Sequence, residues 1–160
     1  PVTADDTIEL AIAIAHGAVW AQMSTVDSRC RPRSRVVHPV WTFRDGELSG
    51  WLTTRKTTLK SRHLAANPNV SLAYLAPNHD LAYFDCTATW ADDLREKEEC
   101  WRTFKDAPAP VGYDPVSIWP DGPTSPSFEV LRFTPYRVQA ARGTEIAAGA
   151  RPALVRLPTT

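Results

Sequence analysis

Hydrophobic and polar positions near the start of the chain follow a helical period. Thr3-Ala4-Asp5-Asp6 has the pattern of a capping box, which begins many helices. Ile8, Ile12 and Ala15 then recur at the spacing i, i+4, i+7. Gly17 follows them as a stop signal, so we expect a short amphipathic helix that ends near this glycine.

Two further helices are predicted later in the chain. The second begins within residues 54–58 and ends before Asn67-Pro68, because the residue before a proline is pushed out of the helical region. Asp92-Asp93 has the pattern of an N-terminal cap for the third helix. One face of this helix carries acids, and its opposite face carries Leu94, Trp101 and Phe104.

Between the helices, runs of β-type residues are separated by turn signals such as Asp45-Gly46. Six or so short strands with hairpin spacing and inserted helices favour an α+β protein built on an antiparallel barrel. Neither a G-x-G-x-x-G nor a P-loop motif is present, which argues against nucleotide-binding folds of those types. The expected strands cover residues 18–26, 33–43, 48–54, 70–75 and 81–90, with the last strand or strands at 128–134 and 137–141.

Two segments have no periodic pattern. Residues 108–126 hold six of the fourteen prolines, which predicts a long irregular loop around Trp119. Residues 143–160 show no convincing period, and we expect them to form a loose C-terminal tail. The sequence therefore predicts one domain over residues 1–142.

Composition agrees with a globular domain. The chain has 160 residues, of which 43% are hydrophobic and 22% charged, and this excludes a disordered tail, a collagen-like fibre and a coiled coil. Residues 10–26 lack charge and proline, but His16 and Gln22 make them too polar to cross about 30 Å of hydrocarbon. The formal net charge is zero, so we expect neither a nucleic acid nor a membrane as a partner.

The cysteines indicate a reducing environment. Cys30, Cys86 and Cys100 are odd in number, and their spacing matches no zinc pattern. A chain of this length does not need disulfides for stability, so we predict free thiols, no metal site and a cytoplasmic protein.

Charge is nevertheless concentrated locally. Residues 29–62 carry nine of the eighteen basic side chains and only two acids, Asp45 and Glu47. Within them, residues 53–60 combine hydroxyls and cations where a strand leads into a helix. Such donors at a helix N-terminus are suited to a phosphate monoester. Solubilising charges on a capped helix are the alternative interpretation, and a nucleic-acid groove is disfavoured by the neutral net charge.

No catalytic residue can be assigned from the sequence. His16, His38, His63 and His79 occur without a nucleophile motif around them. Asp92-Asp93 fits a helix cap better than an acid–base pair. A phosphate site without an evident acid, base or nucleophile fits a protein whose reactive atom belongs to a cofactor.

An ordered series of segments carries a family resemblance. Residues 31–41, 45–48, 51–54, 60–68 and 70–74, followed by 83–93 and 131–135, resemble the flavin-binding split-barrel superfamily of pyridoxamine 5'-phosphate oxidase-like proteins. The resemblance covers about residues 18 to 141, and the order of the set carries it rather than any single motif.

The resemblance implies a six-stranded antiparallel split β-barrel with flanking helices. It also implies a homodimer with two cofactor sites at the interface, each holding FMN. The family's ring-binding strand matches Arg35, Val36, Val37, His38 and Pro39, and its phosphate-binding positions match Thr53, Thr54 and Lys60, with Thr58 close by.

Departures from the family pattern argue against pyridoxamine 5'-phosphate oxidase activity. Val40 stands where the oxidase has a substrate-contacting lysine, and Leu59-Lys60 stands where it has a basic pair. The C-terminal substrate motif Arg-x-His is also absent, because Arg142 is followed by Gly143 and Thr144. What remains is similar to the general stress protein-like and actinobacterial reductase-type branches.

We therefore expect an FMN-binding oxidoreductase that acts on a small molecule by hydride or electron transfer at the flavin ring. One alternative is a reductase that uses the deazaflavin coenzyme F-420, whose longer anionic tail suits the surplus arginines. The other is a non-enzymatic flavin carrier or sensor. Trp119 either covers a cofactor site, which could be the partner's, or packs its loop onto its own barrel.

Overall fold

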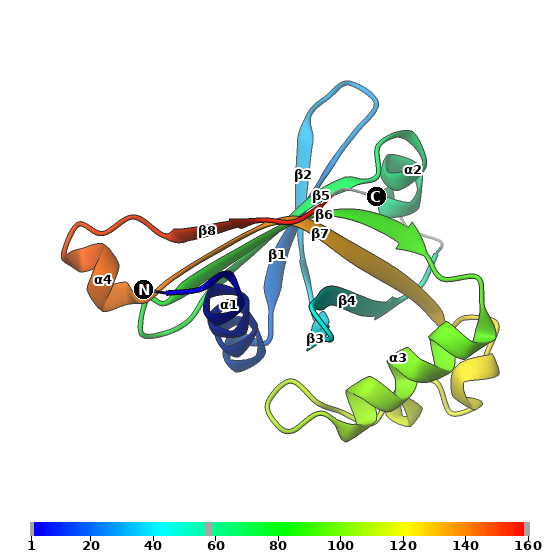
Figure 1. Cartoon of the computed structure of the whole chain (residues 1–160). Helices are drawn as coiled ribbons and strands as arrows, with labels where there is room; N and C mark the ends of the chain where they lie inside the picture. The colour runs from blue at the N-terminus through cyan, green and yellow to red at the C-terminus, as the bar shows by residue number, and fades with distance from the viewer. Residues whose placement is uncertain (1, 57–58, 159–160) are drawn as a thin grey trace.

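The computed structural model describes residues 2–56 and 59–158, which form one antiparallel sheet with flanking helices (Figure 1). The helices are α1 (Ala4–Ala18), α2 (Leu59–Ala66), α3 (Leu94–Asp106) and α4 (Gly143–Ala147), with the 3-10 turns η1 (Pro115–Ser117) and η2 (Gly122–Thr124). The strands are β1 (Ala21–Val26), β2 (Pro32–Val37), β3 (Val40–Arg44), β4 (Glu47–Thr54), β5 (Asn69–Leu75), β6 (Leu81–Trp90), β7 (Glu129–Ala141) and β8 (Ala153–Arg156).

The sheet is open and has eight strands. Its order is β2-β1-β5-β6-β7-β4-β3, and β8 pairs with β7. All of these pairings are antiparallel, and within the described residues none joins β2 to β3. The α+β class is confirmed, whereas the expected six-stranded barrel is not.

Proline explains part of the difference between the six strands expected and the eight strands observed. The predicted run 33–43 is divided after Val37, and β3 begins at Val40. Pro39 lies in the break, because a proline has no N–H to donate to a strand ladder. By contrast, residues 129–141 form the single long strand β7, in which Pro135 lies directly before a register shift in the pairing with β6. Such a bulge accommodates a proline within a strand.

The C-terminal segment differs from the loose tail that we expected. Residues 143–147 form α4, and β8 pairs with the part of β7 that β4 leaves free. The backbone N–H of Gly143 also donates a hydrogen bond to the Asp80 carboxylate at 2.8 Å. Strand pairing uses backbone N–H and C=O groups, so it can occur without the side-chain period that the sequence lacks here.

Local signals in the sequence are confirmed at several element ends. The hydroxyl of Thr3 accepts from the N–H of Asp6, whose carboxylate accepts in return from the N–H of Thr3, so α1 begins with a capping box. Asp93 caps α3 by accepting from the N–H of Arg95 at 3.0 Å. The β3–β4 hairpin turns at Asp45 and Gly46, which both have positive φ angles as a type I′ turn requires.

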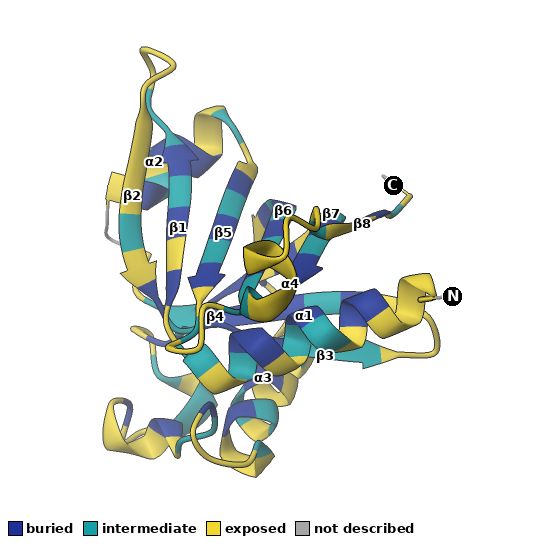
Figure 2. Ribbon diagram, turned by 90° about the vertical axis from the view of Figure 1, so that its left-hand side faces the viewer, coloured by how far each residue is buried: buried dark blue, intermediate teal, exposed yellow. Residues whose placement is uncertain are grey.

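The larger core lies between α1 and the sheet. Buried and less buried residues alternate along β5 and β6, as expected for strands with one covered face (Figure 2). The Trp41 ring stacks on Phe84 with centroids 3.9 Å apart, and Gly50 permits this packing because a Cβ there would lie 2.5 Å from the indole. No helix of the described residues is both long enough and apolar enough to cross a membrane.

A second core forms where α3 and the proline-rich loop meet β4 and β7. Trp119 is buried there, and its Nε1 donates to the Ser127 carbonyl at 3.1 Å. Its ring packs edge-on against Phe128 with centroids 5.1 Å apart. Trp119 therefore packs the loop onto its own chain, which supports the second of the two interpretations of this residue.

Candidate functional site

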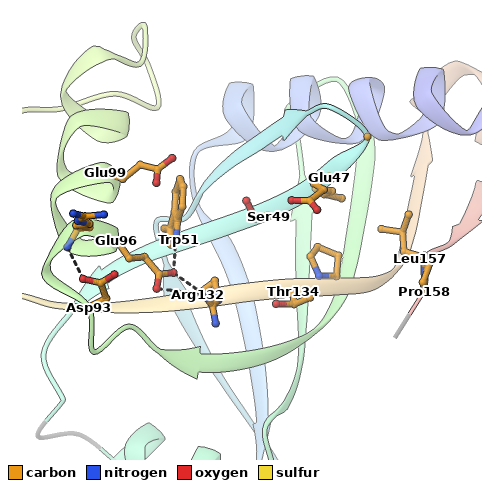
Figure 3. A pocket seen from close by; sticks show the side chains of 14 residues that line it. Glu47, Ser49, Trp51, Asp93, Glu96, Glu99, Arg132, Thr134, Leu157 and Pro158 are labelled. Carbon is orange, nitrogen blue, oxygen red and sulfur yellow. Dashed lines mark hydrogen bonds and ion pairs between the residues drawn. The ribbon is translucent and has the colours of Figure 1, made fainter. Parts of the chain in front are cut away.

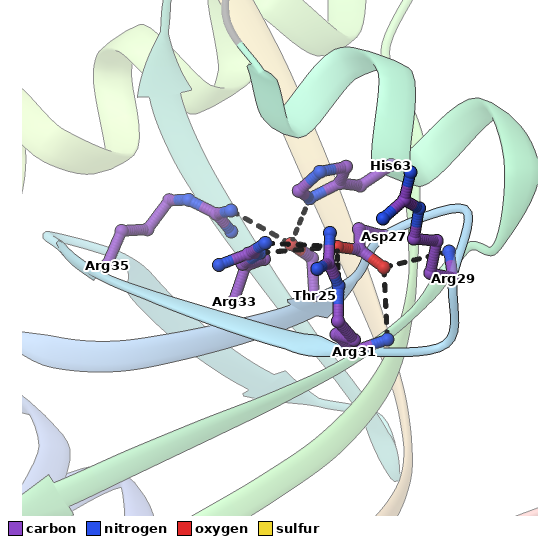
Figure 4. Close-up of polar contacts among 7 residues, drawn as sticks. All are labelled: Thr25, Asp27, Arg29, Arg31, Arg33, Arg35 and His63. Atoms are coloured by element: carbon purple, nitrogen blue, oxygen red, sulfur yellow. Dashed lines mark hydrogen bonds and ion pairs between the residues drawn. The ribbon is translucent and has the colours of Figure 1, made fainter.

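The β1–β2 hairpin turns basic side chains toward α2. In its register, Thr25 lies opposite Arg33, and Met23 lies opposite Arg35. Directly opposed residues share one face of a sheet, so both arginines lie on the face of the buried Thr25. α2 packs against β1, and His63 on this helix reaches Thr25 (Figure 4).

Arg35 carries a buried nitrogen without a partner. Its NH2 donates to Thr25 Oγ1 at 2.9 Å, whereas its NH1 is buried and has no hydrogen-bond partner in the described part of the chain. Burial lowers the pKa of Arg35. A guanidinium N–H without an acceptor is costly in a protein interior, so this atom is suited to an added anion.

Thr25 links Arg35 to His63. Its side chain is fully buried, and its Oγ1 lies 2.8 Å from His63 Nδ1. The hydroxyl oxygen accepts from Arg35 NH2 and is also hydrogen-bonded to His63 Nδ1. The chain of two hydrogen bonds holds the Arg35 guanidinium in place.

Lys60 adds a second buried cation. It lies near the start of α2 with 7% of its surface exposed, and its Nζ contacts the Arg55 carbonyl at 3.5 Å. Burial and then the positive charge of Arg35 lower the pKa of Lys60. Within residues 2–56 and 59–158, neither cation forms an ion pair with a carboxylate. We call Thr25, Arg35, Lys60 and His63 the cationic cluster.

The predicted phosphate-binding threonines are arranged differently. Thr53 lies opposite the buried Val130, and its hydroxyl is 2.6 Å from the hydroxyl of Tyr113. Thr54 lies on the other face of β4, opposite Glu129. No hydrogen bond in the described residues joins either threonine to Arg35 or Lys60, and Thr58 lies outside the described residues.

The predicted ring-binding strand presents two different faces. Val37 is buried on the inner face, and Pro39 is buried in the break after β2. Val36 is 69% exposed on the outer face, opposite Gln22 of β1, which in turn lies opposite Ala73 of β5. The outer face of the sheet therefore presents a row of side chains, from Val36 on β2 through Gln22 on β1 to Ala73 on β5.

His38 is held as one tautomer between aromatic rings. Its ring nitrogen Nε2 lies 2.7 Å from the Val111 carbonyl, which can only accept, so Nε2 carries the proton. Its ring lies 5.2 Å from the rings of both Trp20 and Tyr113. Burial lowers the pKa of His38, which favours the neutral ring with a free lone pair on Nδ1. Tyr113 connects this histidine to Thr53.

Sequence reasoning missed Thr25, His63 and Tyr113. Thr25 is the polar member of the alternating run Ala21, Met23, Thr25, and a polar residue on the buried face of a strand is a usable signal. His63 follows Lys60 at helical spacing i+3, which puts both on one face. No local signal connects Tyr113 to Thr53, because its loop is irregular.

Another cavity lies elsewhere on the chain and has the opposite charge. It measures about 690 Å³ and is lined by β4, β7, the first turns of α3 and the C-terminal segment (Figure 3). Glu96 accepts from Trp51 Nε1 and from Arg132 NH1, both at 3.2 Å. The carboxylates that line this acidic cavity, which would repel a phosphate, are those of Glu47, Asp93, Glu96 and Glu99. None of the predicted cofactor-binding residues lines the acidic cavity.

Solved structures similar to this chain share the fold. General Stress Protein 26 from Bacillus anthracis is 18% identical with a TM-score of 0.65, covering 93% of this chain and 97% of that one. A pyridoxamine 5'-phosphate oxidase-related, FMN-binding protein from Nostoc punctiforme is 13% identical with a TM-score of 0.58, covering 95% and 93%. A heme-binding protein from Mycobacterium smegmatis is 18% identical with a TM-score of 0.67, covering 92% of this chain and 57% of that one.

No curated protein matches the sequence. A family model does match. The model described as pyridoxamine 5'-phosphate oxidase aligns with residues 13–142, which include every strand except β8, the whole cationic cluster, and His38 with Tyr113. Because this match covers most of the sequence, the chain belongs to the pyridoxamine 5'-phosphate oxidase family.

Proposed function

We propose that this protein binds FMN and acts as an oxidoreductase on a small molecule. The observation that carries the proposal is the buried NH1 of Arg35, which has no partner among the described residues, beside the buried ammonium of Lys60. A phosphate monoester would supply the acceptor that NH1 lacks and would neutralise the repulsion between the two cations. The family includes FMN-binding proteins, such as the similar protein from Nostoc punctiforme.

The residues present fit this cofactor at its phosphate. Arg35 and Lys60 would hold the phosphate, while Thr25 and His63 would fix the direction of the guanidinium. Thr53, Thr54 and Thr58 remain predicted contacts from the adjoining end of β4 and the segment that follows it. The bound flavin would supply the capacity to accept and donate a hydride or an electron.

The ring would lie along β2, with Val36 and the backbone of residues 35–39 against it. His38 would act there as a neutral side chain, because its Nε2–H is committed to Val111 and its Nδ1 can accept a hydrogen bond. Trp20 and Tyr113 flank this imidazole and would exclude water from that side.

A second copy of the chain would complete the site. Family members are typically dimers, and this chain exposes Trp20, Val36 and Leu75 by 60%, 69% and 67%. Trp20 precedes β1, Val36 is on β2 and Leu75 ends β5, so these apolar side chains belong to neighbouring strands of one region. We propose that a homodimer covers them and that the cofactor binds at the interface.

Two positions where the chain departs from the oxidase pattern argue against turnover of pyridoxamine 5'-phosphate. Val40 is buried in the second core, so this position can offer the substrate neither a charge nor a hydrogen bond. Arg142 and the residues after it lead into α4. In a peroxide-coupled assay with saturating pyridoxamine 5'-phosphate, we expect no appreciable turnover beside a known oxidase, even with FMN added. Comparable turnover of the two enzymes would contradict this interpretation of Val40.

The deciding experiment combines a spectrum with a titration. The absorption spectrum of the purified protein distinguishes bound FMN from the deazaflavin F-420, and turnover with an electron donor distinguishes an enzyme from a flavin carrier. Lys60→Ala should weaken FMN binding by about 10- to 150-fold, because a charged donor to a partly buried anion is lost. Lys105→Ala, which removes an exposed lysine from α3, is the matched control. Unchanged FMN affinity in Lys60→Ala would rule out this phosphate site.

A further inference from the structure

A cavity that shares no residue with the cationic cluster lies between α1, β3 and α3. It measures about 440 Å³, which is within the range of about 300–1,000 Å³ that is typical of ligand pockets. Val40 and Trp41 of β3 line it as buried residues, whereas its charged lining residues are exposed. We call it the α1–α3 cavity, and its polar lining residues used below are His16, Arg44, Glu99, Arg102 and Asp106.

His16 brings a hydrogen-bond donor to the α1–α3 cavity. The backbone N–H of Trp41 donates to His16 Nε2 at 3.0 Å, and because this backbone nitrogen cannot accept, Nε2 carries a lone pair. Burial lowers the pKa of His16, and the charge of His38 lowers it further, so the ring is neutral and has its proton on Nδ1. No hydrogen bond in the described part of the chain uses this Nδ1–H. The donor is therefore available to a ligand.

Four charged side chains line the α1–α3 cavity without pairing. Glu99, Arg102 and Asp106 lie at i, i+3 and i+7 on α3, a spacing that puts them on one face and allows opposite charges to pair. Arg44 of β3 adds a second guanidinium. Within residues 2–56 and 59–158, none of the four forms an ion pair. The cavity therefore contains two cations and two anions that can each interact with a ligand.

This set of groups matches a ligand that carries both signs of charge. A carboxylate would accept from the Arg102 guanidinium and from His16 Nδ1–H, while an ammonium group would donate to Asp106. An ion of one sign would be attracted by one pair of side chains and repelled by the other. The uncharged lining residues Val40 and Pro108 would contact the hydrocarbon part of the ligand.

We propose that the α1–α3 cavity binds a free α-amino acid with an apolar side chain. Such a molecule carries its carboxylate and its ammonium group on the same carbon, as the neighbouring positions of Arg102 and Asp106 on α3 require. The proposal goes beyond FMN binding and does not depend on it, because no residue of the cationic cluster lines this cavity.

The test uses three compounds with the same hydrocarbon chain. L-leucine carries both charges, L-leucinamide lacks the carboxylate, and 4-methylpentanoate lacks the ammonium group. Isothermal titration calorimetry with the full chain gives the dissociation constant of each compound. The NMR signal of the Trp41 backbone N–H, which His16 accepts, reports whether the compound enters the cavity.

Four variants carry the charges of the ligand back to single side chains. Arg102→Ala and Asp106→Asn each remove one charge from the α1–α3 cavity. Arg95→Ala and Glu98→Gln remove the same charges at exposed positions of α3 that do not line this cavity, and they serve as matched controls. Arg102 and Asp106 are exposed as well, so their replacement should leave the fold intact.

We expect each one-charge compound to bind about 5- to 20-fold more weakly than L-leucine, because a charge-assisted hydrogen bond is lost. Arg102→Ala should weaken L-leucine binding by a similar factor without weakening L-leucinamide, which has no carboxylate to lose. Asp106→Asn should weaken L-leucine without weakening 4-methylpentanoate. The two control variants should bind L-leucine like the unmodified chain.

Three results would overturn the inference. The first is that L-leucine does not bind to the full chain. The second is that L-leucinamide or 4-methylpentanoate binds as tightly as L-leucine, which would mean that the ligand needs only one charge or none. The third is that Arg102→Ala and Arg95→Ala affect L-leucine equally, which would place the amino acid outside the cavity. FMN titration of the same samples is independent of all three, so the proposed function would stand or fall separately.

Discussion

The cationic cluster and the acidic cavity both bring charged side chains together, yet they differ in whether those charges are satisfied. In the acidic cavity, the half-buried Glu96 accepts from Trp51 and Arg132, and the other carboxylates reach water. In the cationic cluster, Arg35 NH1 is buried without a partner within residues 2–56 and 59–158, and Lys60 has a carbonyl at 3.5 Å as its acceptor. The acidic cavity encloses about 690 Å³, but it is the cationic cluster that contains a buried donor without an acceptor among the described residues.

This difference shows why cavity size alone is a poor guide to a functional site. A paired carboxylate near water is stable without a ligand, whereas a buried cation without an acceptor is stabilised when an anion arrives. The better guide to the functional site is therefore whether each buried polar atom, such as Arg35 NH1, has a hydrogen-bond partner.

The strongest test of the comparison removes the unsatisfied cation. Arg35→Leu should weaken FMN binding by about 10- to 150-fold, since the buried anion loses a charged donor. The free energy of unfolding of the cofactor-free protein should fall by less than about 1 kcal/mol or even rise, because a buried, unpaired charge is removed. Titration with FMN and urea denaturation measure the two effects.

Glu96→Gln in the acidic cavity is the control for Arg35→Leu and should leave FMN affinity unchanged. An equal effect of the two variants on FMN binding would show that the cationic cluster and the acidic cavity do not differ in their demand for an anion. The comparison would also fail if Arg35→Leu cost several kcal/mol of stability while binding stayed normal.

Thr25→Val tests whether the hydroxyl organises the cationic cluster. Valine keeps the shape of the side chain but leaves Arg35 NH2 and His63 Nδ1 without their partner, so stability should fall by about 1–3 kcal/mol. Thermal or urea unfolding of the cofactor-free protein gives the value. Thr25→Ser retains the hydroxyl and should restore most of the loss. A neutral effect of valine would show that the two contacts do not act together.

The stability of the protein should also depend on pH through two histidines, His16 and His38, that lie outside the cationic cluster and the acidic cavity and are held neutral. The Trp41 N–H donates to His16 Nε2 at 3.0 Å, which a protonated nitrogen could not accept. Burial lowers the pKa of His16, and the charge of His38 lowers it further; burial also lowers the pKa of His38.

Below the unfolded-state pKa of about 6.5, the unfolded chain therefore binds more protons than the folded one. The stabilising contribution of these neutral rings is complete above that pH and is lost as the pH falls through the lower folded-state values. Unfolding measured between about pH 8 and 5 should show this decline. His16→Gln, whose amide oxygen can accept from Trp41, should flatten it. An unchanged slope in His16→Gln would exclude His16 as a source.

The smallest effect is expected in the acidic cavity. The side chain of Arg132 is 45% exposed where it pairs with Glu96, so Arg132→Ala should cost only about 0.2–1 kcal/mol of stability. High salt should reduce this difference, because it screens an exposed pair. Urea denaturation at low and high salt measures both quantities. A loss of several kcal/mol would mean that the acidic cavity, too, depends on a strong charge interaction.

Much of the local structure could be predicted from the sequence. Thr3 and Asp93 begin helices, Asp45-Gly46 turns a hairpin and Asn67-Pro68 follows the end of α2, because each signal acts within a few residues. The sequence places Arg35 on the expected ring-binding strand and Lys60 with Thr53 at the expected phosphate site. That the two cations lie close together emerges from the structure, in which the hydroxyl of Thr53 contacts Tyr113 instead.

The sequence by itself determined the α+β class, the helix ends, the hairpin and the concentration of basic residues near the start of α2. Only the tertiary structure decided that the sheet stays open and that β8 joins β7, because strand pairing depends on which backbone edges remain free. It also decided that Thr25, Arg35 and His63 form one hydrogen-bonded chain, although 38 positions separate the threonine from the histidine. Such contacts, and the Arg35 nitrogen that lacks a partner in the described part of the chain, depend on distances and burial that arise only when distant segments pack together.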